Sequence, residues 1–142
     1  MSFLCLDLGQ RRIGVAVSDP SGVLATPWGV LPGDESLERL ADRLRPIIQE
    51  RGVEALVVGL PAHLNGDLGP EAERAELVAA ELEQRLGLAV HLWDERLTTA
   101  QATRLLVDAG VRRGRRKKVV DKLAATLILQ GFLDSRAAGA AP

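Results

Sequence analysis

The chain opens with the stretch FLCLDLGQRRIGVAVS, residues 3–18, and this stretch decides the fold. Its first six residues form an apolar run typical of a buried strand, and the polar residues after Gly9 predict a tight turn. Residues 12–18 then read as a second strand, and a turn over residues 19–22 leads to a third strand over residues 23–31. Strands this closely spaced predict an antiparallel three-stranded meander.

Beyond the meander, the spacing of apolar residues changes from that of strands to that of helices. Helices are expected between Ser36 and Gly52, from Ala75 to Gly87, from Thr98 or Thr99 to Gly110 and over residues 119–134, and strands over residues 54–58 and 89–93. Strands separated by helices after a meander predict an α/β fold, a mixed five-stranded sheet with helices on both faces. We expect one domain over residues 1–134 and a flexible tail over residues 135–142.

The composition narrows the class of protein. A chain of 142 residues fits one domain, and because aromatic residues make up only 3%, Leu, Val, Ile and Ala must build its core. Cys5 is the one cysteine, so no intrachain disulfide and no Cys/His zinc site is predicted, and a buried free thiol fits a reducing compartment. We find no signal-peptide pattern and no apolar run near the ~20 residues that a membrane span requires, which favours a cytoplasmic protein.

The net charge of -1 hides an asymmetry along the chain. Residues 1–111 contain 10 Lys/Arg and 17 Asp/Glu, a balance of -7, whereas residues 112–142 contain 8 Lys/Arg and 2 Asp/Glu, a balance of +6. Most of the positive excess lies in one run, which consists of Arg112, Arg113, Arg115, Arg116, Lys117 and Lys118. Such runs are commonly solvated loops, but this one directly precedes an acidic residue and predicts contact with the phosphates of a nucleic acid.

Three acidic residues adjoin apolar segments, where an unpaired carboxylate carries a desolvation cost. Asp7 interrupts the first strand, Glu95 follows the strand over residues 89–93, and Asp121 opens the alanine-rich part of the last helix. Asp7 and Glu95 fall at the carboxyl ends of strands, where ligands bind in open sheets. If the fold brings all three together, a hard divalent cation is the natural partner.

Each of these acids alone has an ordinary structural explanation. Asp7 could cap its own turn, although strand alternation directs it to the same face as Cys5. Asp94 and Glu95 could form a solvated charge cluster between a strand and a helix. Asp121 could simply favour the N-terminal end of its helix through the helix macrodipole.

Taken in order along the chain, four motifs resemble one family. They are Asp7-Leu8-Gly9-Gln10-Arg11-Arg12-Ile13-Gly14-Val15-Ala16, Val58-Gly59-Leu60-Pro61, Asp94-Glu95-Arg96-Leu97-Thr98-Thr99 and Val120-Asp121-Lys122-Leu123-Ala124-Ala125. Over nearly the whole chain, this pattern resembles the RuvX/YqgF family, bacterial proteins described as Holliday junction resolvases and as pre-16S rRNA nucleases.

The resemblance implies an RNase H-like (RuvC-like) fold and cleavage of phosphodiester bonds with Mg²⁺ or Mn²⁺. By position, the family's catalytic and metal-binding residues carry over to Asp7, Glu95 and Asp121, with Arg12, Asp94 and Lys122 as accessory candidates. RuvC-type nucleases usually have a fourth carboxylate one helical turn after the helix Asp, where this chain has Ala124. The resemblance therefore leaves open whether one or two ions bind.

The resulting hypothesis is a metal-dependent endonuclease that acts on Holliday junction DNA, on the 5′ end of pre-16S rRNA, or on both. Symmetric cutting of a four-way junction would require a C2 homodimer. One alternative reads the Asp-x-Gly hairpin as the phosphate loop of an actin- or Hsp70-like ATPase or a sugar kinase, although those enzymes close two such domains around a nucleotide. The other alternative is a catalytically silent nucleic-acid-binding or ribosome-assembly factor with the same fold.

Overall fold

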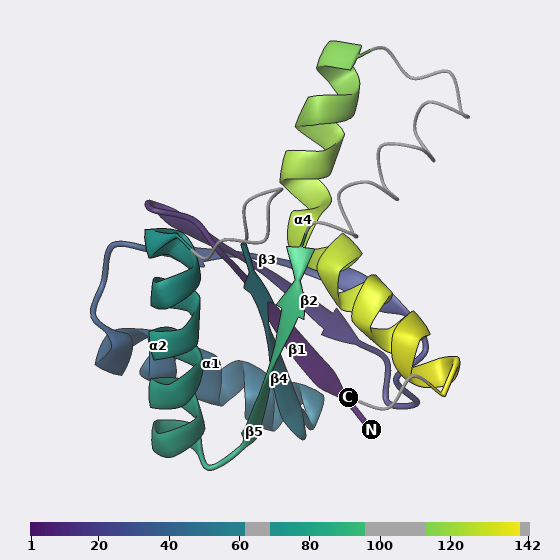
Figure 1. Ribbon diagram of the computed structural model, residues 1–142. Coiled ribbons are helices and arrows are strands. Elements are labelled where there is room, and N and C mark those ends of the chain that lie inside the picture. Colours follow the sequence, from purple (N-terminus) through teal and green to yellow (C-terminus); the bar gives the residue numbers. More distant parts are fainter. Residues whose placement is uncertain (62–68, 96–112, 140–142) are drawn as a thin grey trace.

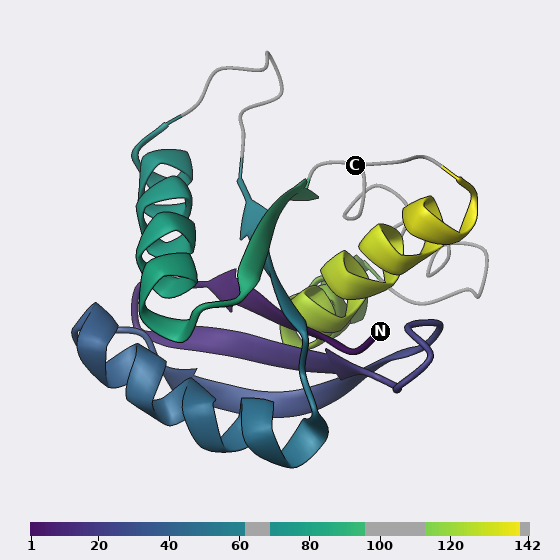
Figure 2. The ribbon, with the colours of Figure 1, turned by 90° about the horizontal axis from the view of Figure 1, so that it is seen from below.

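A computed structural model describes residues 1–61, 69–95 and 113–139, and within the last helix it describes side chains from residue 123 onward. The strands are β1 Phe3–Leu8, β2 Arg12–Ser18, β3 Ala25–Pro32, β4 Ala55–Leu60 and β5 Ala89–Asp94, and the helices are α1 Leu37–Arg51, α2 Pro70–Leu86 and α4 Arg113–Ala137. The five strands form one sheet in the order β3-β2-β1-β4-β5. Helices α1 and α2 cover one face and α4 covers the other (Figures 1 and 2), so the predicted α/β fold is confirmed. No helix in the described ranges is both long and apolar enough to cross a membrane.

The three N-terminal strands form the predicted antiparallel meander. In the β1–β2 hairpin, Leu4 pairs with Val17 and Leu8 with Ile13. The hairpin turn closes where the Gly9 N–H donates to the carbonyl oxygen of Arg12 at 2.9 Å. A Cβ atom at Gly9 would lie 2.5 Å from that oxygen, so the turn admits only glycine two residues after Asp7.

Strands β1, β4 and β5 run parallel, which places their carboxyl ends along one edge of the sheet. Leu6 pairs with Val58 and Val58 with Leu92, so the central strand ends lie side by side. Helix α1 connects β3 to β4, and its ends are those that the sequence predicts. Ser36 accepts a hydrogen bond from the Arg39 N–H at 3.2 Å, and Gly52 ends the helix in the left-handed conformation, with φ 62°.

Alternation along the strands divides the buried side chains between two cores. The core under α1 and α2 contains Leu4, Leu6, Ile13, Val15, Leu44, Leu56, Val58, Val78 and Leu82. The core under α4 contains Phe3, Cys5, Val57, Ala125, Ile128, Leu129 and Phe132. Asp7 follows Phe3 and Cys5 in the alternation, so it lies on the α4 face, as the sequence predicts. Cys5 is a buried free thiol, also as predicted.

One side chain fastens the described part of α4 to the start of β3. The Gln130 side chain accepts a hydrogen bond from the Ala25 N–H at 2.9 Å and donates one to the Val23 carbonyl at 3.0 Å. It also donates to Asp134 at 2.9 Å. Because Ala25 is buried, its N–H has no access to water as a substitute, and the glutamine therefore fixes how α4 lies across the sheet.

Helix α4 differs from the prediction at both ends. It begins by Arg113 and ends at Ala137, rather than covering residues 119–134, so residues 113–118 of the basic run are helical. Arg and Lys are good helix formers, and they outweigh the roughly 1 kcal/mol that Gly114 costs. The expected flexible tail is helical as far as Ala137, and residues 140–142 lie outside the described ranges. The helix predicted from Thr98 or Thr99 to Gly110 also lies outside them.

Candidate metal and catalytic centre

The structure brings two of the three predicted acidic residues together. Asp7 is the last but one residue of β1, and Glu95 directly follows β5. The parallel strand β4 lies between these two strands, yet the Glu95 side chain forms a hydrogen bond with Asp7. The two carboxyl groups therefore meet across the end of β4, on the face that α4 covers.

The environment of the pair favours a proton or a cation between the two groups. Burial above all, together with the hydrogen bond to Asp7 and the negative charges of Asp7 and Asp94, raises the pKa of Glu95 to about 8. The same negative charges also affect the pKa of the Cys5 thiol. Burial raises the pKa of its thiol well above the ordinary value, with Asp7 and Glu95 adding to the rise.

Gly59 of β4 makes the meeting of the two acids sterically possible. A Cβ atom at this position would lie 3.0 Å from Glu95 Cδ, 3.1 Å from Glu95 Cγ and 3.0 Å from Ile128 Cδ1. Real Cβ atoms hardly ever approach other atoms this closely, so the Glu95 side chain passes through the space that any larger residue would fill. This glycine belongs to one of the four sequence motifs, but the sequence predicted no role for it. Its position inside an otherwise apolar strand is the signal that could have identified it.

The third predicted acidic residue belongs to helix α4. Asp121 lies in α4, one helical turn before Ala125, but its side chain is outside the described part of the chain. Ala125 and Ile128 are both buried against the sheet. A Cβ atom at Gly14 would touch Ala125 Cβ at 3.5 Å and Asp7 Cβ at 3.7 Å, so this helix face lies directly over Asp7. Among the described side chains, no three His, Cys, Asp or Glu residues gather as a metal site.

The remaining predicted residues fall in different places. Arg12 is exposed at the start of β2, and Asp94 is half-buried at the end of β5. Arg112 lies outside the described ranges. The side chains of Arg113, Arg115, Arg116, Lys117, Lys118 and Lys122 are also outside them, although their backbone is helical. The first part of α4, which contains these residues, projects beyond the sheet (Figure 1).

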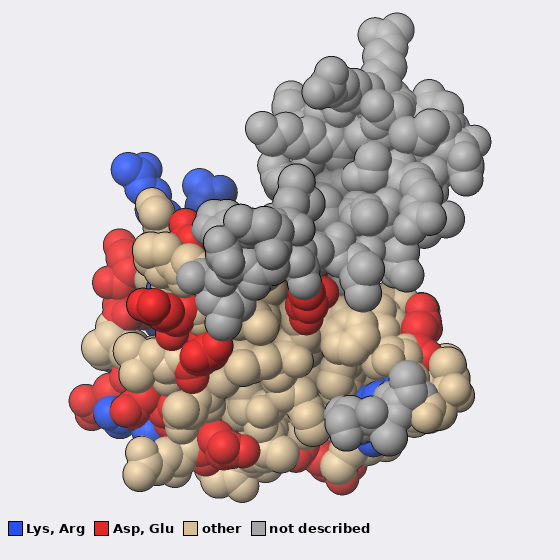
Figure 3. Space-filling view, in the orientation of Figure 1, with Lys and Arg blue, Asp and Glu red and all other residues tan. Residues whose placement is uncertain are grey.

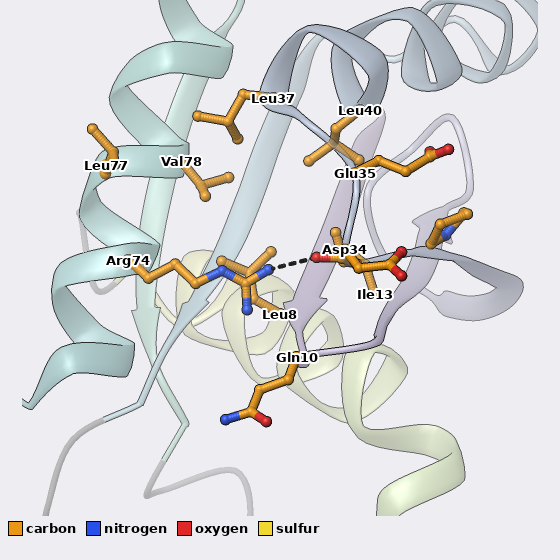
Figure 4. Close-up of a pocket in the computed structure, with 12 residues that line it drawn as sticks. Leu8, Gln10, Ile13, Asp34, Glu35, Leu37, Leu40, Arg74, Leu77 and Val78 are labelled. Carbon is orange, nitrogen blue, oxygen red and sulfur yellow. Dashed lines mark hydrogen bonds between the residues drawn. The ribbon is translucent and has the colours of Figure 1, made fainter.

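Arg74 of α2 supports the turn after Asp7 from the opposite face of the sheet. Its guanidinium donates to the Gly9 carbonyl at 2.8 Å and to the Gly33 carbonyl at 3.2 Å. Figure 4 shows the side chain reaching from α2 toward Leu8 and Gln10, across a pocket of about 390 Å³. Arg74 therefore joins α2 to two loops at the same end of the molecule as the acids. The sequence contains no local signal for this contact.

Comparison with known proteins adds the family. The RuvX family, described as Holliday junction resolvase, matches residues 1–135. A protein of Geobacillus thermodenitrificans is 49% identical over 137 residues, covering 96% of this chain and 99% of its own length. Proteins of Pelotomaculum thermopropionicum and Listeria innocua are each 47% identical over 136 residues, covering 96% and 95% of this chain and 88% and 99% of their own. All three are named as candidate pre-16S rRNA nucleases.

Among solved structures, RuvC of Thermus thermophilus shares the fold. The complex of that protein with a Holliday junction substrate matches with a TM-score of 0.59 at 16% identity, covering 96% of both chains. The structure of RuvC alone matches with a TM-score of 0.58 at 16% identity, covering 97% of both chains. The predicted RNase H-like (RuvC-like) fold is thus confirmed. With a family match over residues 1–135 and relatives that are nearly half identical and named as candidate nucleases, this chain belongs to the RuvX family.

Proposed function

We propose that this chain is a divalent-metal-dependent endonuclease that hydrolyses phosphodiester bonds in structured nucleic acid. The observation that supports this most directly is the contact between Asp7 and Glu95 at the carboxyl ends of parallel strands. Two adjoining, half-buried carboxylates repel each other unless a proton or a cation lies between them. A cation that binds there relieves this repulsion, and hard oxygen ligands select Mg²⁺ or Mn²⁺.

The donor atoms of the site fit such an ion. Asp7 and Glu95 offer carboxylate oxygens, and Asp121 on α4 is the proposed third ligand. Ile128 and Cys5 are buried beside the pair and keep water away from its inner side. Because the pKa of Glu95 is raised, its carboxyl group holds a proton near neutral pH that a bound cation must displace. When bound, one or two divalent ions would supply an activated water and stabilise the charge on the departing 3′ oxygen.

The basic run is proposed to hold the nucleic acid by its phosphates. Arg112, Arg113, Arg115, Arg116, Lys117 and Lys118 precede Asp121 in the chain, so their charges would attract a polyanion toward the same end of the molecule. Replacing Arg115, Arg116 and Lys117 with Gln should reduce the salt dependence of DNA binding by about 2–3 units of log-log slope, since each neutralised phosphate contributes roughly 0.9. A slope equal to that of the wild type would exclude these residues from the interface.

Two substrates are included in the proposal. The names of the relatives favour the 5′ end of pre-16S rRNA, and the description of the family favours a Holliday junction. The experiment that separates them offers the enzyme a precursor rRNA leader and a four-way DNA junction at the same salt and Mn²⁺ concentrations. If the junction is the substrate, we also propose a C2 homodimer, because symmetric cutting requires two sites. A cytoplasmic location stays a prediction, in keeping with the free thiol of Cys5.

The acid residues themselves provide the test of the proposed function. Asp7→Asn and Asp121→Asn should each abolish cleavage with Mg²⁺ or Mn²⁺, because each removes a charged ligand. Asp42→Asn is the matched control, since this carboxylate lies on α1 and forms only an exposed ion pair with Arg45 at 3.6 Å. Full activity in both site variants would end the metal-site assignment. A wild-type protein that binds these nucleic acids but never cuts them would favour the catalytically silent factor instead.

A further inference from the structure

A groove of about 590 Å³ opens beside Asp7 on the α4 face of the sheet. Its floor crosses β2 and β3, and its far wall is the middle of α4. The residues that line it are Asp7, Gly9, Arg12, Gly14, Val15, Pro27, Gly29, Val30, Leu123, Ala125 and Thr126. The groove thus runs from the proposed metal ligand toward β3, the edge strand, and away from β5 and Glu95.

Glycines keep the floor of this groove low. Gly29 lines the groove with backbone alone, because it has no side chain. Gly14 lies between Asp7 and α4, and a Cβ atom there would only touch its neighbours. Beside these bare backbone positions, Val30 is 59% exposed although it is apolar. The floor therefore offers a flat apolar surface immediately next to a carboxylate.

Charged, polar and apolar residues are unevenly represented in the lining of the groove. Asp7 and Arg12 are the charged side chains, Thr126 has a hydroxyl group, and the other lining residues are apolar or glycine. Among the described residues, this lining contains no Asn, Gln or Glu, and Arg12 is the only Arg or Lys. Of the lining side chains, Asp7, Arg12 and Thr126 are the ones able to hydrogen-bond to a base edge, so most of the lining can contact a base only through its shape. A ligand that fits has a flat apolar part and a phosphate nearby.

Charge on the rest of the surface favours the same side of the sheet. Helix α2 on the other face contains Glu71, Glu73, Glu76, Glu81 and Glu83 against Arg74 and Arg85. Figure 3 shows acidic side chains gathered over this helix. A polyanion is repelled from that face, so a strand that reaches Asp7 is expected to approach from the α4 face, where the groove lies.

We propose that this groove holds the base of one nucleotide next to the phosphate that is cut, and that it accepts the base by shape rather than by sequence. The inference rests on the proposed nuclease function and adds a position for the substrate strand, which crosses β2 and β3 rather than β5. Stacking of a base on an aromatic side chain would change binding roughly 5- to 150-fold, and because the described lining is aliphatic, loss of the base here should weaken binding by an amount near the lower end, about fivefold.

The test scans one cleavable oligonucleotide with single abasic sites at each position around the cut. We would measure cleavage by the wild type in Mn²⁺, and we would measure binding without metal by fluorescence anisotropy. One abasic position should lower affinity and kcat/KM by about fivefold or more, whereas exchanging the four bases there should change them less than about threefold. Val30→Glu should weaken binding of the intact strand. It should also remove the abasic effect, because in this variant the base no longer binds in the groove.

The matched control is Leu77→Glu, which puts the same charge at an apolar residue that is 58% exposed on α2. This variant should retain the full abasic effect. The inference falls if no abasic position matters, if the effect is the same in Val30→Glu, or if one base is strongly preferred. If the wild type binds but never cleaves, the proposed function fails, while the binding measurements still decide whether the groove holds a base.

Discussion

Replacing Gly59 with alanine should separate the catalytic site from the fold that supports it. The added methyl group would lie 3.0 Å from both Glu95 Cδ and Ile128 Cδ1. Carbon atoms in favourable contact are about 3.5–4.0 Å apart, so each neighbour must move by roughly 0.5–1 Å. Ile128 is buried among other apolar side chains, whereas Glu95 can turn away from Asp7. The carboxylate pair is therefore the part of the structure that gives way.

Both consequences of this change have an expected size. Overpacking costs about 1–3 kcal/mol, and the loss of glycine's freedom in the unfolded chain offsets about 0.4–1 kcal/mol, so the net loss of unfolding free energy is roughly 0–2.6 kcal/mol. A displacement near 1 Å in a catalytic group can lower the rate by about 100-fold. We expect cleavage to fall by about 10- to 100-fold and the affinity for Mn²⁺ to fall by a similar factor.

A second substitution distinguishes the two effects. Ile128→Val removes the Cδ1 atom that the new methyl group would meet, but it leaves the conflict with Glu95 in place. In the double variant, urea unfolding should therefore show less destabilisation than the sum of the single variants. Cleavage and calorimetric Mn²⁺ binding should stay as weak as in Gly59→Ala alone. Gly59→Ala with wild-type metal affinity and wild-type turnover would refute the role given to this glycine.

Substitutions at three further residues test other contacts that hold the fold together. Gln130→Ala should lower the unfolding free energy by about 1–3 kcal/mol, because the buried N–H of Ala25 loses its acceptor; an unchanged urea midpoint would contradict this. Arg74→Met removes the hydrogen bonds to Gly9 and Gly33, so Mn²⁺ affinity should fall as the turn after Asp7 loosens, and Arg74→Lys should restore it only in part because an ammonium lacks the planar fork. Asp19→Ala should lower the thermal midpoint at pH 7, because backbone N–H groups, Leu24 first among them, and the Ser21 hydroxyl hold the pKa of Asp19 well below its usual value of 3.8. A depressed pKa stabilises the fold above pH 3.8 and loses that effect as the pH falls further, so the difference from the wild type should shrink in acid; a constant difference from pH 7 to pH 2 would argue against it.

The elements that the sequence predicts best are those with local signals. Alternation in β1 assigns Asp7 to the face of Phe3 and Cys5, and Ser36 and Gly52 mark the ends of α1. The predicted start of α4 was wrong, because the run of basic residues was interpreted as a loop. Arg and Lys nevertheless favour helices when no apolar face is required. Apolar residues at helical spacing are absent from residues 113–118, so the pattern gave no sign of a helix there.

The contact between Asp7 and Glu95 belongs to a different class of information. Each acid has a local pattern that predicts its strand end, but the pattern cannot tell whether the side chains bridge the strand between them. That outcome depends on the order of the sheet, which places β4 between β1 and β5, and on the absence of a side chain at Gly59. The contacts of Arg74 are equally hard to predict from the sequence, because its partners are backbone carbonyls of residues far away in sequence.

These contacts also explain why the proposed site can tolerate the repulsion of its own charges. The Asp7–Glu95 pair lies between the glycine turn after Asp7 and the buried side chain of Ile128. While these two carboxyl groups stay in contact, a proton or a cation must relieve the repulsion between them. A looser frame would let the carboxylates turn toward water and would lose the affinity for metal. Rigidity around Gly9 and Gly59 is thus a requirement of the proposed chemistry as well as of the fold.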